Sequence, residues 1–269
     1  MDDEYKEEIE TYEFIIRYNN QKLIDFLGNE IIVCDNLSRI DVPQYYGKKI
    51  NYDQINELFF DSIKTLNKDT IDYFKEEVPK IKKERTNFFE NGEAQLVGNS
   101  KKQEVHLTAN DFKEIDLVAF SHEMGHIPTL KRGCLNDYYE YQEVLSIFLE
   151  YLSWVKIDKE NAKKLFVNQR LNVSSEESNN VLNFYFDLEP EGEYREKLCE
   201  YRIRDAYKYI LSFEYALKLV DLYEKDREYL TKLINDHLFN FKPFNELERT
   251  FDSDIRECKN ILNLCKKYK

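Results

Sequence analysis

The sequence predicts a mainly α-helical protein with one small β-hairpin. Only seven Gly and five Pro occur in 269 residues, and a chain with so few turn-forming residues favours long regular elements. Apolar residues recur at helical spacing through most of the chain. Residues 91–110 are the exception, because the turn signal Asn91-Gly92 precedes two short segments typical of β-strands and Gly98-Asn99-Ser100 separates them.

Two regions are predicted along the chain. Residues 1–50 are expected to form an N-terminal helical cap or extension, and residues 51–269 the main domain. Neither an internal repeat nor a low-complexity linker marks the boundary between them. With 42% hydrophobic residues, the chain has enough apolar material for a sizeable core, arranged as one large domain or two small ones.

Two helices are predicted between the cap and the hairpin. Asn51 opens the first helix, and its apolar face contains Ile55, Leu58, Phe59, Ile63 and Leu66. A break at Asn67-Lys68-Asp69 ends this helix, and the second is expected to run from about residue 70 to 90. After the hairpin, helices follow one another from about residue 112, including one over residues 137–155, with a break near Asp158.

The charge and the cysteines exclude several classes of protein. The formal net charge is −13, whereas binding to phosphate backbones or to anionic membranes needs concentrated Lys and Arg, so we expect neither partner. The five cysteines are scattered and never spaced as CxxC, the acidic N-terminus is not a signal peptide, and no apolar run is long enough to span a membrane. These features predict a cytoplasmic protein with reduced thiols.

The strongest chemical signal is the motif His122-Glu123-Met124-Gly125-His126. His122 and His126 are four positions apart, so on a helix they share one face and both imidazoles can reach one zinc ion. Glu123 lies beside them, where its carboxylate can take a proton from a zinc-bound water instead of binding the metal. The alternative is a helix with two ordinary histidines and a surface glutamate. That alternative is the weaker one, since only four histidines occur in the chain and apolar residues precede the motif.

A third metal ligand is expected from the helix predicted over residues 137–155. Catalytic zinc sites usually combine three protein ligands with one open position. Glu143 lies in an otherwise apolar run, and a buried carboxylate is costly unless it is paired or bound to a metal. Glu150 is seven positions further on the same face, where it can accept a hydrogen bond from a ligand histidine. The alternative, a solvated helix carboxylate, describes Glu140 better than Glu143.

Two residues in and after the motif bear on the helix itself. Gly125 destabilises a helix by roughly 1 kcal/mol relative to Ala. Close approach of another backbone, or of a substrate near the metal, is a reason to accept that cost. Pro128 is expected to end the helix soon after the second histidine.

These residues resemble the thimet oligopeptidase and oligoendopeptidase F family of zinc peptidases. The family pattern His-Glu-x-Gly-His is present at residues 122–126, and its Glu-x-x-Ser-x-x-x-Glu pattern is present at residues 143–150. The segment Ala206-Tyr207-Lys208-Tyr209 is similar to a tyrosine-rich segment of the family. The resemblance covers about residues 50–240 and corresponds to the catalytic half of a family member.

The resemblance implies a helical, zincin-like catalytic domain with Zn²⁺ as the cofactor. It implies that His122, His126 and Glu143 bind the zinc, and that Tyr207 and Tyr209 contact the tetrahedral intermediate. The alternative for both tyrosines is a core aromatic residue at helical spacing. The substrate implied is a short, extended oligopeptide that lies alongside an edge strand of the hairpin.

The chain also departs from the family pattern. Pro128 and Thr129 stand where a further histidine is common, Ser212 stands where a glycine is usual, and Glu143 follows His126 by only 17 positions. The leading prediction is a zinc-dependent metallopeptidase. These departures motivate the alternative, a zinc-binding regulatory protein that is either non-catalytic or acts on a single substrate.

Overall fold

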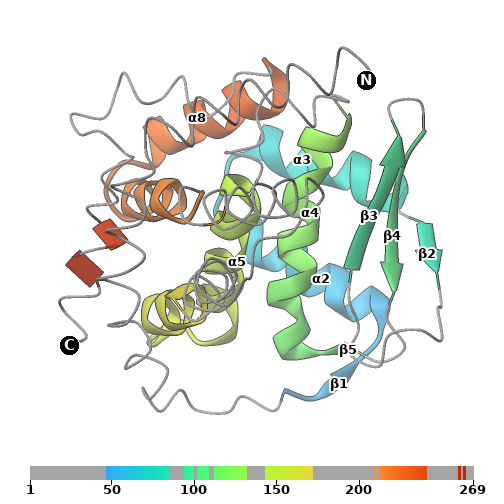
Figure 1. The fold of residues 1–269 in the computed structure, drawn as a ribbon, viewed down its shortest axis with the longest axis horizontal. Coiled ribbons are helices and arrows are strands. Elements are labelled where there is room, and N and C mark those ends of the chain that lie inside the picture. The colour runs from blue at the N-terminus through green and yellow to red at the C-terminus, as the bar shows by residue number, and fades with distance from the viewer. Residues whose placement is uncertain are drawn as a thin grey trace, which may run out of the picture.

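The computed structural model describes residues 47–80, 82–84, 94–99, 102–108, 112–131, 143–171, 209, 212–240, 260–261 and 263–264. Most of these residues are helical, which confirms a mainly α protein (Figure 1). The predicted cap falls almost entirely outside the described residues, so its boundary at residue 50 stays a prediction. Glu140 and Tyr207 also lie outside them.

The first helix of the main domain forms as predicted. Helix α2 (Tyr52–Ile63) begins after Asn51, whose side chain accepts a hydrogen bond from the Gln54 backbone at 2.9 Å while the Gln54 side chain accepts one from the Asn51 backbone. This reciprocal capping satisfies two N–H groups that a helix leaves unpaired at its start. The buried face of α2 includes Ile55, Phe59 and Ile63.

The second predicted helix is shorter than expected. Helix α3 (Lys68–Glu77) begins after Asn67, which caps it through the backbone N–H of Thr70. The prediction of a helix to residue 90 is wrong beyond Glu77, because a 3₁₀ turn (Val78–Lys80) and strand β2 (Lys82–Glu84) follow. Pro79 lies inside this turn, and a proline has no N–H to continue the helical hydrogen bonds.

The hairpin is present and belongs to a three-stranded sheet. Strands β3 (Ala94–Asn99) and β4 (Lys102–Thr108) pair antiparallel, with Asn99 opposite Lys102. Among the described strands, β2 pairs with β4 in parallel, which gives the order β2-β4-β3 and places β3 at an edge. Strands β1 (Lys49–Ile50) and β5 (Phe112–Lys113) form a separate antiparallel pair. Both β3 and β4 contact helix α4 (Leu117–Lys131), as Figure 1 shows.

Helix α4 (Leu117–Lys131) carries the histidine motif between the sheet and the helical core (Figure 1). It follows a 3₁₀ turn (Glu114–Asp116), and Leu117, Phe120, Met124 and Ile127 on it are buried. The prediction that Pro128 ends this helix is wrong, because the helix continues to Lys131. Pro128 is itself buried. Its missing N–H removes one helical hydrogen bond, and the buried packing around it keeps the turn helical.

Helix α5 (Val144–Ile157) lies at the centre of the core. Every residue from Val144 to Trp154 is buried, as expected for a helix with neighbours on all sides. It begins seven residues later than the predicted span 137–155, and Glu143 occupies its N-cap position. The break at Asp158 is confirmed. Further helices cover residues 162–171, residues 212–225 and α8 (Arg227–Phe239).

Small residues allow α4 and α5 to pack closely. A Cβ atom on Gly125 would lie only 2.4 Å from the Cα of Ser146 on α5, so no larger residue fits there without a shift. One turn away on α4 and two turns away on α5, the buried hydroxyls of Ser121 and Ser153 are 2.7 Å apart. The close approach of another backbone at Gly125 is therefore the expectation that holds, and it brings the histidine face of α4 against the start of α5.

Candidate metal centre

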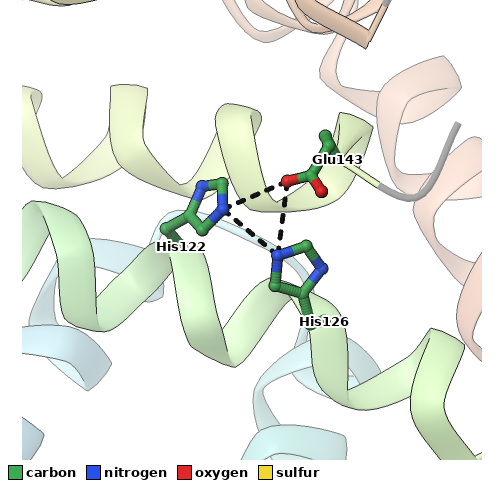
Figure 2. A group of neighbouring side chains, drawn as sticks. All are labelled: His122, His126 and Glu143. Atoms are coloured by element: carbon green, nitrogen blue, oxygen red, sulfur yellow. Dashed lines mark hydrogen bonds and ion pairs between the residues drawn. The ribbon is translucent and has the colours of Figure 1, made fainter. Parts of the chain in front are cut away.

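The structure brings His122, His126 and Glu143 together. The two Nε2 atoms are 3.1 Å apart, and Glu143 Oε2 lies 3.1 Å from that of His122 and 3.3 Å from that of His126. Figure 2 shows the histidines projecting from α4 toward the Glu143 carboxylate at the start of α5. Among the described residues, these three side chains form a group that could hold a metal ion.

The spacing of the three atoms fits a single small cation. Zinc is bound at about 2.0–2.1 Å in tetrahedral geometry, which places neighbouring ligand atoms about 3.3 Å from one another. His122 Nδ1 lies 2.6 Å from Glu150 and donates a hydrogen bond to it, so a His122 ring with no second proton presents the lone pair of Nε2 toward Glu143. In that form the lone pair and the carboxylate oxygen are 3.1 Å apart, and a cation bound between them would attract both.

Glu143 is the most enclosed of the three ligand candidates. It is 3% exposed, whereas the two histidines are half-buried. Burial raises the pKa of the Glu143 carboxyl, but the charge of His126 and hydrogen bonds with His122 and His126 outweigh it and hold the pKa well below its usual range. The carboxyl group is therefore an anion, the form that binds a metal.

Behind His122, a second carboxylate is held by a buried cation. Glu150 Oε1 lies 2.6 Å from His122 Nδ1. Arg170, on the helix over residues 162–171, donates from Nε to Glu150 Oε2 at 2.6 Å and also pairs through Nη2 with Oε1. Burial lowers the pKa of Arg170 to about 10, although the charges of Glu143 and Tyr209 oppose this. Arg170 therefore remains cationic at neutral pH.

Arg170 is the site residue that sequence reasoning missed. The only signal for it is a single basic residue in the segment from Leu165 to Leu171, which contains no acidic residue. A buried cation needs an acidic partner, but nothing in the local pattern identifies Glu150 as that partner.

The remaining predicted site residues are less fully placed. Glu123 follows His122 on α4 and is half-buried. Tyr209 is half-buried and lies within electrostatic range of the Arg170 guanidinium, because it contributes to the pKa of that group. Tyr207 lies outside the described residues, so its role stays a prediction.

Comparisons with known proteins identify no relative. No protein-family model matches the sequence, and no curated protein and no solved structure matches it either. The resemblance to the oligopeptidase family therefore depends on the motifs alone. In the part of the chain that the structure describes, no helix combines the length and the apolar character needed to cross a membrane.

Proposed function

We propose that this chain is a zinc-dependent metallopeptidase that hydrolyses peptide bonds in short oligopeptides. The observation that supports this most directly is the convergence of His122, His126 and Glu143, with ligand atoms 3.1–3.3 Å apart. Two imidazoles and one carboxylate are a donor set found in catalytic zinc sites, which leave a fourth position open. The adjacent Glu123 gives the motif a base in addition to its ligands.

Each residue of the site has a distinct task in the proposed reaction. His122, His126 and Glu143 hold the zinc, and Glu150 orients the ring of His122. Bound zinc supplies Lewis acidity, which polarises the scissile carbonyl and makes water more acidic. Glu123 takes the proton of the attacking water and passes it to the leaving amine.

Two further features support a peptide as the substrate. Strand β3 is at an edge of the sheet that the described strands form, and it contacts α4. An extended peptide can add to such an edge through backbone hydrogen bonds, which brings it close to the helix that carries the motif. Tyr209 remains a candidate for stabilising the oxyanion, the role that the resemblance to the oligopeptidase family implies for it.

The proposal is tested by metal analysis followed by digestion of a peptide library. We expect purified wild-type protein to contain about one zinc per chain and to cleave library peptides. Glu123→Gln should keep the metal and lose at least about 100-fold in rate, because general-base catalysis contributes that much or more. Glu228→Gln, an exposed glutamate on α8, is the matched control and should cleave normally. Absence of bound zinc, or full activity of Glu123→Gln, refutes the proposal.

The same experiment separates the peptidase from the alternative suggested by the sequence. A zinc-binding regulatory protein would contain the metal and cleave no library peptide. A protein that acts on a single partner would also leave the library intact. In that case Glu123→Gln, which retains the ligands, should capture the partner in a pull-down.

A further inference from the structure

We propose that Arg170 is a positioning residue for the metal centre. It fixes the carboxylate of Glu150, and Glu150 in turn fixes the ring of His122 so that Nε2 faces the metal position. The inference rests on the metal-binding part of the proposed function and does not depend on peptide cleavage. Neither of the two sequence motifs contains Arg170, which belongs to a separate helix over residues 162–171.

The contact between Arg170 and Glu150 is made by two nitrogen atoms. Nε donates to Oε2 at 2.6 Å, and Nη2 pairs with Oε1. The side chains are only 6% and 2% exposed, so water does not compete for these bonds. Two parallel bonds between planar groups fix orientation as well as distance, so the Glu150 carboxylate cannot rotate away from His122.

The fixed orientation of the Glu150 carboxylate also restricts the ring of His122, through the oxygen Oε1. It lies 2.6 Å from His122 Nδ1, and the Arg170 Nη2 atom is itself 3.3 Å from the same Nδ1. Both nitrogens carry hydrogen, so they do not bond to each other, and both direct it at the shared oxygen. The imidazole ring is rigid, and holding Nδ1 therefore sets the direction of Nε2 toward Glu143.

Charge balance gives Arg170 a second effect on the site. Glu143 and Glu150 are both buried carboxylates that flank His122. Arg170 neutralises Glu150, which leaves Glu143 as the carboxylate whose charge a bound cation would balance. A lysine would supply the charge but not the two-pronged geometry, so a loss of Zn²⁺ affinity in Arg170→Lys is a loss due to geometry alone.

The test measures the affinity of the metal-free protein for Zn²⁺ by competition with a chelator. We expect Arg170→Lys and Arg170→Met to bind Zn²⁺ about 10- to 100-fold more weakly, as is typical when a partner that orients a ligand is lost. With Co²⁺ in place of Zn²⁺, the absorption spectrum should change in both variants. Lys163→Met is the matched control, because Lys163 lies on the same helix but pairs at the surface with Glu224.

A purely structural role for Arg170 predicts a different result. If Arg170 only joined two helices, its variants would melt at lower temperature while Zn²⁺ affinity and the Co²⁺ spectrum stayed as in wild type, and this would overturn the inference. Should Arg170→Met fail to fold, Arg170→Lys carries the same measurement. Wild-type protein that binds no Zn²⁺ would instead refute the proposed function, and the inference with it.

The order of the interactions can be tested with a double variant. If Arg170 acts through Glu150, then Arg170→Met added to Glu150→Gln should weaken Zn²⁺ binding no further than Glu150→Gln alone. Losses that multiply in the double variant would show that Arg170 acts independently of Glu150, which contradicts the inference.

Discussion

At the scale of single residues, Glu143 has its carboxylate buried between two imidazoles at the N-cap of α5. Glu143→Gln keeps the shape of the side chain but removes the negative charge. We expect Zn²⁺ affinity to fall by more than the 10- to 100-fold that loss of an orienting partner costs, because a neutral amide is a poor ligand for zinc. Chelator competition measures the loss.

The control for this prediction uses the same substitution at a surface position. Glu160 follows α5 and is exposed, so Glu160→Gln should bind Zn²⁺ as wild type does. Equal affinity of Glu143→Gln and wild type would show that Glu143 is not a ligand.

The sequence reveals the three ligand candidates for a local reason. His122 and His126 share a helical face by spacing alone, and Glu143 is conspicuous as an acid in an apolar run. Arg170 could not be found in this way. Arg170 and Glu150 are 20 positions apart in the chain and lie on different helices. They come into contact only because these two helices pack against each other.

At the scale of elements, the close packing of α4 on α5 leads to a prediction about Gly125. By helix propensity alone, Gly125→Ala should stabilise α4 by up to about 1 kcal/mol. The added Cβ would instead meet the Ser146 backbone at 2.4 Å. Overpacking of this kind typically costs about 1–3 kcal/mol, so we expect a lower free energy of unfolding, measured with denaturant.

Whether Gly125→Ala lowers or raises the free energy of unfolding decides this prediction. Ala119 is exposed on the same helix, and Ala119→Gly calibrates what propensity contributes in α4. A Gly125→Ala variant that is more stable than wild type would show that moving the two helices apart costs less than the gain in helix propensity.

Element types could be predicted well from the sequence, and element ends less well. The capped helix α2 and the hairpin have strong local signals at Asn51 and at the turn residues. The two prolines gave opposite errors. Helix α3 stops before Pro79, whereas α4 continues through Pro128. Tertiary packing decides whether a helix stops before a proline or continues through it. The turn at the proline lacks one hydrogen bond, and it stays helical only where packing stabilises it.

At the scale of the whole molecule, a buried carboxylate joins the C-terminal part of the chain to the core. Glu214 Oε1 accepts hydrogen bonds from the backbone and side chain of Asn260, at 3.0 and 2.6 Å, and Oε2 accepts one from the Ile261 backbone at 3.0 Å. Burial raises the pKa of Glu214 above its ordinary value of 4.5, even though these hydrogen bonds lower it.

The raised pKa predicts a pH dependence of stability. The folded state holds the Glu214 proton more tightly than the unfolded chain does, so the stabilising contribution is complete below pH 4.5 and is lost as the pH rises through the raised pKa. The free energy of unfolding of wild type minus that of Glu214→Gln should therefore fall with rising pH in this window. Urea unfolding over a pH series measures it, and a difference that grows with pH would contradict the prediction.

The position of the three ligand candidates on consecutive helices has a consequence for folding. A metal held by all three would cross-link the chain between His126 and Glu143, 17 positions apart. By analogy with a disulfide, restricting a loop of about 15 residues in the unfolded chain is worth roughly 3 kcal/mol. This increase in folding stability needs neither Glu123 nor a substrate. The three ligand side chains would therefore be under selection for the stability of the fold as well as for catalysis.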